Sequence, residues 1–517
     1  MSAIGSQPKY DRERLLYRAQ FILGPRPAEE LPAWKRFRIN DRVWLTAHSD
    51  LNITQETAGN KSLTLLGYIL DPDNPKAANS DIVAELLPKL WSGDPRTNSP
   101  QCTNRLGGRW ILIADDGIQV RLFSDALGQR QICYTSPPVG GEIWCASQPG
   151  TLARLLKLEV DPEAQEFVQA VLRTGEKEYW WPYNTSLYRE IKHLNPNHYL
   201  DYGAATPRRF WPDGKLSPLR LGQAVKLGAR LIRGLMSSAA NRFPLQLMMT
   251  AGWDSRVVFC ATKDLSSNVS YLTFLREGFT LESADVSLPR QLLQKFGRTQ
   301  DILPLPDRME EEFREIYTQN MAAAHEVWGP IAQALYELGP PQKLRVTGGG
   351  SETIRQQFRP STSGLTPEIL AHYGSADGQA FAIRAFRRWL ADVPKDLPIG
   401  ILDLFYWEQK CGNWLAVGQT EWDITGNSSF TPYNCRALLA TLLAVNEEYR
   451  LPPFYELHTA LIKELWPEAW SVPINPHKTM YREKPNVKSV AKEFLVRTHL
   501  LDYIPKRSIA FAKKLLP

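Results

Sequence analysis

The chain has few cysteines, six among 517 residues, and they are scattered without the paired spacing of a metal site. That argues against a cysteine-based metal centre and favours buried thiols in a reducing compartment. The longest apolar stretch, Ala437–Val445, is too short to cross a bilayer. The first residues also lack the basic-then-apolar order of a signal peptide. We therefore expect a cytoplasmic protein with no membrane partner.

Charge of one sign is not in large excess either. The formal net charge of +6 is too small to indicate a nucleic-acid partner. Basic residues are concentrated after Pro476, where we expect solvated helix faces, with an anion-attracting surface as the alternative. There is no internal repeat and no low-complexity tract. The length predicts more than one domain, with enough apolar residues for sizeable cores.

The first part of the chain has the pattern of short strands interrupted by one helix, which predicts a mixed α+β domain. The expected helix covers Asp81–Leu90, and Asp115–Gly117 is a hairpin signal. We place this domain at 1–205 and a turn-rich, charged linker at 206–218. The expected strands are Leu63–Leu70, Arg109–Ala114, Ile118–Phe123, Gln131–Tyr134 and Ile143–Ala146.

The second domain, 219–517, begins with a long amphipathic helix from Leu221 and then alternates strands with helices. Such α/β alternation predicts a parallel sheet with ligands at the carboxyl ends of its strands. From roughly Pro367 onward the chain reads as a helical, tryptophan-rich extension. The expected strands are Leu245–Thr250, Val269–Leu275, Asp301–Leu303 and Leu344–Thr347, with helices from Asp254 and over Leu281–Phe296.

The most informative segment is Thr250-Ala251-Gly252-Trp253-Asp254-Ser255, where a strand gives way to a small-residue loop and then a helix. Outward N–H groups beside the positive end of a helix dipole favour phosphate. Thr250 and Ser255 add hydroxyl donors, and Asp254 adds an acceptor for a divalent cation. The alternative is an ordinary strand-to-helix turn with Asp254 as its cap.

A second glycine-rich loop, Gly348-Gly349-Gly350, is followed by Glu352 at the end of another expected strand. Glycines let the backbone approach a ligand closely. If both loops face one crevice, Asp254 and Glu352 become paired carboxylates able to hold magnesium between phosphates. The alternative makes the glycines a flexible connection and Glu352 a surface acid.

At this point the chain resembles the asparagine synthetases and their relatives among the N-type ATP pyrophosphatases. Thr250–Ser255 is similar to the family's Ser-Gly-Gly-x-Asp-Ser pyrophosphate loop. The likeness extends to segments on both sides of that loop, in the family's order. These segments are Leu106–Trp110, Ser124–Arg130 with Tyr134, Leu194–His198 and Phe430–Asn434.

The resemblance implies an Ntn-hydrolase-like β-rich sandwich of the glutamine amidotransferase kind, then a parallel-sheet ATP-pyrophosphatase domain with a helical C-terminal part. It implies that a substrate carboxylate attacks ATP to give an acyl-adenylate and pyrophosphate, after which ammonia or an amine displaces AMP. ATP and Mg²⁺ are the implied cofactors, with Asp254 and Glu352 on the metal. The implied nucleotide contacts are Leu247, Thr250, Ala251, Gly252, Trp253, Asp254, Ser255, Thr273, Phe274, Gly348 and Gly349.

Several departures from the family bear on catalysis. The glutamine-hydrolysing members carry a cysteine nucleophile with a free α-amine, whereas Ser2 stands second here and no cysteine precedes Cys102. We therefore expect the first domain to have lost glutaminase activity and to serve as a scaffold or in substrate recognition. Gly349 stands where the family has a catalytic glutamate. The family's transition-state lysine corresponds to His458 or, as a rival, to Lys478.

Two further residues are candidates for catalysis. Arg256 follows the Asp-Ser pair and is expected to reach a phosphate or carboxylate, with a salt bridge across the helix as the alternative. Glu408 lies in a tryptophan-rich stretch and is a candidate base or amine-orienting group. The tryptophans themselves indicate core packing, with a platform for a sugar or aromatic ligand as the alternative.

The leading hypothesis is an ATP-dependent amide-forming ligase acting on a small-molecule, sugar-acid or peptide carboxylate, with ammonia or an amine as donor. A homodimer is one option for its assembly. The second hypothesis is a non-catalytic protein that keeps the nucleotide-binding fold, motivated by Gly349 and by Ala251 in place of a glycine.

Overall fold

The structure is a computed structural model that describes residues 9–91, 100–265, 268–340, 342–358 and 364–476. The chain divides into two compact units, Met1–Val472 and Pro473–Pro517, and nearly all described residues belong to the first. The basic segment after Pro476, including the predicted catalytic Lys478, lies outside the described residues. No described helix combines the length and apolar character that crossing a membrane requires.

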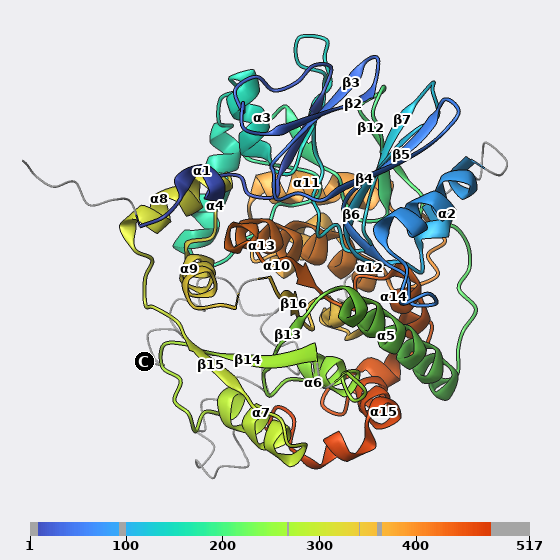
Figure 1. Ribbon diagram of the computed structural model, residues 1–517, viewed down its shortest axis with the longest axis vertical. Helices are drawn as coiled ribbons and strands as arrows, with labels where there is room; N and C mark the ends of the chain where they lie inside the picture. The colour runs from blue at the N-terminus through green and yellow to red at the C-terminus, as the bar shows by residue number, and fades with distance from the viewer. Residues whose placement is uncertain (1–8, 92–99, 266–267, 341, 359–363, 477–517) are drawn as a thin grey trace, which may run out of the picture. The chain divides into compact units, whose positions relative to one another are not determined.

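Two six-stranded antiparallel sheets form the first part of the chain (Figure 1). The strands of the first sheet are, in order, β10 (Ile191–His193), β8 (Cys133–Thr135), β9 (Cys145–Ala146), β1 (Phe21–Gly24), β3 (Val43–Ala47) and β2 (Lys35–Asn40). Those of the second are β12 (Thr206–Arg209), β11 (His198–Asp201), β7 (Val120–Ser124), β6 (Gly107–Asp115), β5 (Lys61–Leu70) and β4 (Ile53–Ala58).

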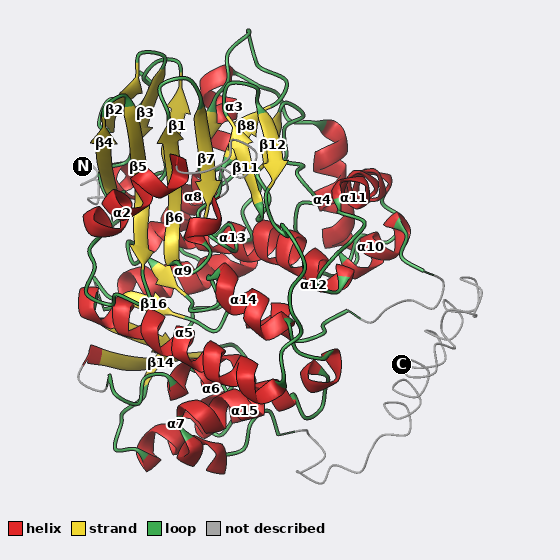
Figure 2. Cartoon of the chain, turned by 90° about the vertical axis from the view of Figure 1, so that its right-hand side faces the viewer, coloured by secondary structure: helices red, strands yellow, loops and turns green. Residues whose placement is uncertain are grey.

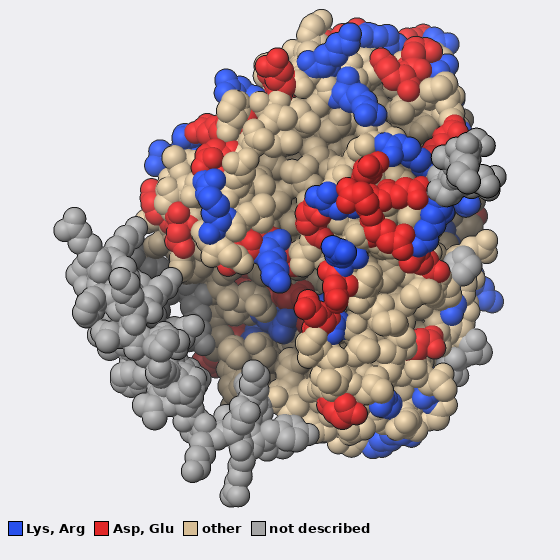
Figure 3. Space-filling model, turned by 90° about the vertical axis from the view of Figure 1, so that its left-hand side faces the viewer, with Lys and Arg blue, Asp and Glu red and all other residues tan. Residues whose placement is uncertain are grey.

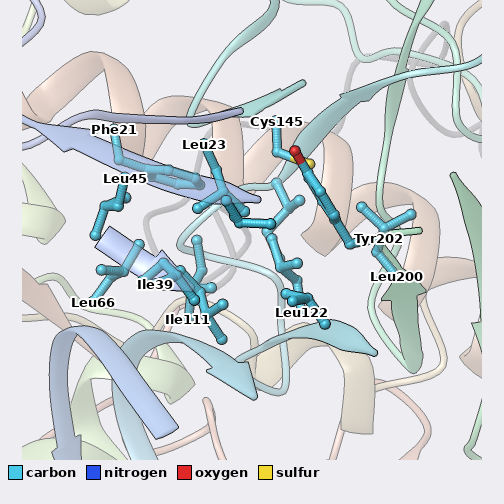
Figure 4. Packing of buried hydrophobic residues seen from close by; sticks show 14 of the residues in the cluster. Phe21, Leu23, Ile39, Leu45, Leu66, Ile111, Leu122, Cys145, Leu200 and Tyr202 are labelled. Carbon is cyan, nitrogen blue, oxygen red and sulfur yellow. The ribbon is translucent and has the colours of Figure 1, made fainter. Parts of the chain in front are cut away.

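The facing surfaces of these sheets bury a shared apolar core (Figure 4). Leu23 and Leu45 from the first sheet pack with Leu66, Ile111 and Leu122 from the second. Side chains alternate between the two faces of a strand, so neighbouring residues of one strand serve different layers. The predicted β-rich sandwich is therefore present.

Helices cover the outer faces of the sandwich. α2 (Asn79–Trp91) packs on the second sheet, where Leu63 and Leu65 point away from the shared core. α3 (Pro149–Leu156) packs on the first sheet beside Trp144. The near-continuous apolar run of β5 follows from this layering, because both of its faces are covered. The remaining helices of this part are α1 (Arg12–Leu15), η1 (Pro100–Thr103) and α4 (Pro162–Arg173).

The predicted linker 206–218 needs correction, since its first residues form a strand. Thr206–Arg209 pairs antiparallel with His198–Asp201 and so belongs to the second sheet. The turn formers before it make a hairpin turn rather than a domain boundary. The sandwich thus extends past residue 205.

The second part contains the predicted parallel sheet, with strands in the order β15-β14-β13-β16-β17. Every neighbouring pair is parallel. Successive strands β13, β14 and β15 run to one side and β16 and β17 to the other, so the order reverses between β13 and β16. Their bounds are β13 (Leu245–Met248), β14 (Val269–Leu275), β15 (Asp301–Pro304), β16 (Leu344–Val346) and β17 (Ser429–Phe430). The short β17 was not predicted.

Helices predominate around and after this sheet (Figure 2). Those of the alternating region are α5 (Leu221–Arg242), α6 (Trp253–Cys260), α7 (Ala284–Lys295), α8 (Glu311–Asn320), η3 (Glu326–Trp328) and α9 (Gly329–Glu337). The later ones are η4 (Ser351–Ile354), α10 (Pro367–Tyr373), α11 (Ala380–Asp392), α12 (Ile401–Phe405), η5 (Tyr406–Leu415), α13 (Ala416–Glu421), η6 (Trp422–Thr425), α14 (Arg436–Leu443), η7 (Glu447–Arg450), α15 (Glu456–Leu465) and η8 (Pro467–Ser471). η5 is wound as a π-helix.

The sandwich and the later part share buried polar contacts. Arg109 on β6 forms an ion pair with Asp423, and the two side chains are 1% and 6% exposed. Asn434 donates to the Gly108 carbonyl at 2.7 Å and accepts from the Leu127 amide at 2.8 Å. Several of the segments that carry the family resemblance therefore meet at this contact.

Candidate active site at the switch point of the parallel sheet

The loops that follow β13 and β16 converge where the strand order reverses, which is the usual ligand position in an open α/β sheet. Asp254 stands in the first turn of α6, after β13, and Glu352 stands in η4, after β16. Gly348 permits this approach, because a Cβ at that position would lie 2.7 Å from the Asp254 Cβ. The predicted pairing of the two glycine-containing loops is present.

A third residue, Arg355, joins the two carboxylates. Its Nη2 atom lies 2.9 Å from Asp254 Oδ2 and 3.8 Å from Glu352 Oε1. The guanidinium stands over the Tyr455 ring, 5.6 Å from the ring centroid. Sequence reasoning missed Arg355, although an acid followed three residues later by an arginine is a signal for local pairing.

Burial perturbs both acids, and the charge of Asp254 adds to this effect at Glu352. Burial raises the pKa of Glu352 to about 7, with the charge of Asp254 as the second cause and Arg355 opposing both. Burial likewise raises the pKa of Asp254, and Arg355 opposes that rise. The Asp254 and Glu352 side chains remain 21% and 28% exposed, so a ligand can still reach them.

His458 also lies at this cluster. Its Nε2 is 3.0 Å from Ser351 Oγ and 3.9 Å from Asp254 Oδ1. Burial, followed by the charge of Arg355, lowers the pKa of His458 to about 3. The imidazole is therefore neutral near pH 7, and it does not supply the positive charge that a lysine would supply there.

The cluster retains unused hydrogen-bonding capacity. Among the described residues, four buried polar atoms at this place have no hydrogen-bond partner: Asp254 Oδ1, Arg355 Nε, Tyr433 Oη and His458 Nδ1. Buried polar atoms are normally satisfied by protein, water or ligand. This group of atoms points to a polar ligand or ordered water at the switch point.

The backbone amides of the first loop were expected to point outward and bind phosphate, but three of them donate to acceptors within the protein. The Ala251 amide donates to Asp285 Oδ1 at 2.9 Å, a carboxylate in the place of an external anion. The Thr250 amide donates to Ser255 Oγ at 3.3 Å, and the Gly252 amide to Thr250 Oγ1 at 3.2 Å. The remaining candidate donors for an anion are the Arg355 guanidinium and the amides at the start of α6, since a helix leaves its first amides without intrahelical acceptors.

The predicted magnesium ligands do not fit the ion as they are arranged. The described part of the chain has no group of three or more His, Cys, Asp or Glu side chains that could hold a metal. Magnesium can be held by two carboxylates and substrate phosphates. Here, however, the Arg355 guanidinium already bridges Asp254 and Glu352. A cation of the protein itself stands between the two acids.

A cavity of about 1080 Å³ lies at the carboxyl edge of the sheet, where the second loop lines it but Asp254, Glu352, Arg355 and His458 do not. Arg276 follows β14, Leu305 follows β15, and Thr347 and Gly349 follow β16, and all four line it. Its volume is at the upper end for small-molecule sites. Acidic and basic side chains are interspersed on the hollowed face that Figure 3 shows, so neither sign dominates that face.

Tryptophans form another wall of this cavity. Trp328, Trp414 and Trp422 line it. Glu178 fixes two of them, since Trp328 Nε1 and Trp414 Nε1 donate to its two oxygens at 2.9 and 2.8 Å. Gln419 also lines the cavity and is 4% exposed, and its Oε1 has no partner among the described residues.

Other predicted nucleotide contacts lie within the sheet rather than on the cavity wall. Leu247 is fully buried in β13, and Thr273 Oγ1 donates to the Met249 carbonyl at 3.0 Å. Phe274 packs against the apolar cluster that includes Leu272 and Leu303. The Trp253 ring, at the start of α6, packs against the rings of Tyr455 and Trp470.

Arg256 does not face the site, which corrects its prediction as a ligand-binding residue. Its side chain is fully buried, and Nη1 donates to the carbonyls of Ala469 and Val472 at 2.9 Å each. Burial lowers its pKa to about 10. The guanidinium anchors α6 to the segment at η8.

Glu408 is also remote from the cavity, contrary to its prediction as a base. Its carboxylate is fully buried and forms an ion pair with Arg209. It accepts from Trp389 Nε1 at 2.9 Å and from Asn197 Nδ2 at 3.2 Å. Sequence reasoning placed it in a substrate pocket because of its tryptophan-rich surroundings, which here include Trp389 as its own hydrogen-bond donor.

The comparisons with known proteins are distant. No protein-family model matches the chain, and no curated protein matches it. Among solved structures it is similar to glutamine phosphoribosylpyrophosphate amidotransferase from B. subtilis complexed with ADP and GMP, with 9% identity and a TM-score of 0.24 over 66% of this chain and 72% of that one. It is also similar to glutamine-dependent NAD+ synthetase from Acinetobacter baumannii complexed with ADP, with 11% identity and a TM-score of 0.20 over 46% and 50%. Values this low assign neither a family nor an activity.

Proposed function

We propose that the protein is an ATP-dependent amide-forming ligase of the asparagine synthetase-like kind, which activates a substrate carboxylate as an acyl-adenylate. One observation carries the proposal: two loops converge at the switch point of a parallel sheet, beside a cavity of about 1080 Å³ along the carboxyl edge. Such a cavity has room for a nucleotide or for a nucleotide with part of a second substrate.

The first step joins the carboxylate to the α-phosphorus of ATP. A carboxylate oxygen forms a bond to that phosphorus, and the bond from phosphorus to the β-bridging oxygen breaks. Pyrophosphate leaves with that electron pair. Negative charge grows on the leaving group, so donors fixed near it stabilise the transition state. Arg355 and the first-turn amides of α6 are the groups proposed for this task.

The second step forms the amide. The nitrogen of ammonia or an amine attacks the acyl carbon, the carbon–oxygen bond to AMP breaks, and the nitrogen loses a proton. We assign no residue as the base of this step, because Glu408 is buried in an ion pair and Gly349 has no side chain. The acyl group is proposed to lie beside Thr347 and Gly349, which line the cavity.

Glutamine is not the proposed nitrogen source. The six cysteines are free, five of them are buried, and burial raises the pKa of each thiol, for example to about 11 for Cys102. A cysteine nucleophile acts as the thiolate, which these pKa values disfavour. We propose that the sandwich acts as a scaffold whose Arg109–Asp423 ion pair holds it to the synthetase part.

The test is product analysis. The protein is incubated with ATP, a panel of carboxylates and ammonia or amines, and pyrophosphate and AMP are measured. Asp254→Ala is expected to abolish pyrophosphate release, with Asp41→Ala, at an exposed surface acid, as the matched control. Full pyrophosphate release by the Asp254 variant would show that the switch-point cluster is not the reaction site.

A non-catalytic nucleotide-binding protein is the second candidate, and the loop amides favour it. The amides of Thr250, Ala251 and Gly252 already have acceptors within the protein. This candidate predicts that the protein binds ATP but releases no pyrophosphate with any combination of carboxylate and amine.

A further inference from the structure

The cation between the two site carboxylates is part of the chain. Arg355 Nη2 bonds Asp254 Oδ2 at 2.9 Å and lies 3.8 Å from Glu352 Oε1, where a divalent ion shared by these acids would stand. The guanidinium is held from a second side by the Tyr455 ring. The Arg355 side chain is 13% exposed, so it is not a freely moving surface residue.

We infer that Arg355 takes the place of a divalent cation, and that this site binds the phosphates of a nucleoside triphosphate or pyrophosphate without a metal ion. The nature of the ligand rests on the proposed function. The replacement of the metal rests on the arrangement of Asp254, Glu352 and Arg355 alone.

The guanidinium has donors left for a phosphate. Nη2 makes the hydrogen bond to Asp254 and the ion pair with Glu352, and Nε has no partner among the described residues. A guanidinium is planar and carries five donors, so one edge can hold Asp254 while another engages a phosphate in the bidentate manner. The first-turn amides of α6 lie beside Asp254, and they add the positive end of a helix dipole.

The same arrangement disfavours a metal. A magnesium site draws its affinity from the negative charge and the open oxygens of its carboxylates. Arg355 cancels one unit of that charge and occupies Asp254 Oδ2. An incoming divalent ion would meet a fixed positive charge at the distance of a direct ligand, so the metal and the guanidinium exclude each other.

The first arm of the test measures the metal alone. Mn²⁺ is titrated into the full chain and free Mn²⁺ is followed by electron paramagnetic resonance. The wild type is expected to bind no Mn²⁺ at this cluster. Arg355→Met frees the two carboxylates and is expected to bind one Mn²⁺ at least about tenfold more tightly, an effect lost in Arg355→Met/Asp254→Asn. Arg38→Met, which removes an exposed arginine paired with Asp41, is the control.

The second arm measures phosphate binding with and without a metal. Pyrophosphate and ATP are titrated calorimetrically in EDTA and in Mg²⁺, and the wild-type affinities are expected to agree within about twofold. Arg355→Met is expected to weaken metal-free binding by about tenfold or more, because it removes a charged hydrogen-bond donor. Arg355→Lys keeps the charge and is expected to recover part of the affinity, which separates a charge effect from misfolding.

The outcomes distinguish this inference from the proposed ligase activity. Wild-type Mn²⁺ binding that Asp254→Asn abolishes would overturn the inference, as would loss of phosphate binding in EDTA or a failure of both ligands to bind. Metal-free phosphate binding without pyrophosphate release from ATP would leave the inference standing and refute the ligase. Ligation that strictly requires Mg²⁺ bound at Asp254 would support the ligase and refute the inference.

Discussion

Substitution of Glu408 by glutamine separates a structural role from a catalytic one. Glu408 is fully buried, and its carboxylate pairs with Arg209 and accepts from Trp389 and Asn197. Glutamine has nearly the same shape but no charge. The variant therefore leaves the Arg209 guanidinium, 10% exposed, without its closest counter-ion.

The size of the effect follows from what remains around Arg209. Removal of one partner of a buried ion pair costs about 3–5 kcal/mol. Arg209 keeps Asp392, whose Oδ2 lies 2.8 Å from its Nη2 and which is 34% exposed. The glutamine carbonyl also keeps one acceptor for Trp389 or Asn197. We therefore expect the lower end of the range, a loss of about 3 kcal/mol in the free energy of unfolding.

The assay is urea unfolding followed by tryptophan fluorescence, alongside titration of ATP or pyrophosphate to the folded variant. Glu166→Gln is the matched control, because Glu166 and Arg173 form a pair in which each side chain is 60% exposed, and its loss is expected to change stability by less than about 1 kcal/mol. Ligand affinity is expected to stay at the wild-type value in both variants. The reasoning is refuted if Glu408→Gln is as stable as the control and releases pyrophosphate yet forms no amide, since that pattern belongs to a base of the second step.

Three further predictions concern the core and the loops. Arg256→Leu is expected to lower the free energy of unfolding by about 2–3 kcal/mol, as judged by urea midpoints, because two buried carbonyls lose their donor. Gly348→Ala is expected to weaken pyrophosphate binding at least about tenfold, because the new Cβ would push α6 away. Gly349→Ala is expected to weaken binding less, because its Cβ would meet only side-chain atoms at 3.2 Å or more. Burial lowers the pKa of His193 to about 4, below its value of about 6.5 in the unfolded chain, so the unfolded state binds more protons between these values. The contribution of His193 to the free energy of unfolding is thus full above pH 6.5 and falls by about 3 kcal/mol as the pH drops toward 4. Thermal unfolding measured across this pH range is expected to show a flatter dependence for His193→Gln. His372→Gln, at an exposed histidine, is the control and is expected to leave the dependence unchanged.

The sequence predicts the layers of this fold well because its hydrophobic periods are strong. Val269–Leu275 is a strand with the expected bounds, and the alternation of strands and helices gives the parallel sheet. What it misses depends on long-range pairing. Thr206–Arg209 has a proline and two arginines and no buried side chain, so nothing in its own pattern distinguishes an edge strand from a linker. β17 is two residues long and exists only through its pairing with β16.

At the site, local pattern gives the positions of side chains better than their partners. Asp254 and His458 lie near each other at the switch point. The end of an expected strand places Asp254 there, whereas His458 was expected there only from the resemblance. Arg256 and Glu408 were misread because a charged residue next to a motif gives no sign of which way it points. Each is buried on the side away from the cavity, where carbonyls or an arginine satisfy it.

Arg355 shows how the missing partner could have been inferred. Two acids brought together in a partly buried place require a cation, since unpaired charges there are costly. Gly348 allows the acids to meet, and the short 3₁₀ turn η4 follows at once. The residue that caps this turn is the third after Glu352, and its amide donates to the Glu352 carbonyl, so it stays beside Glu352. That residue is Arg355, so the chain itself provides the cation between the two acids. Asp254 and Glu352 alone suggest a magnesium site, but together with Arg355 they argue against one.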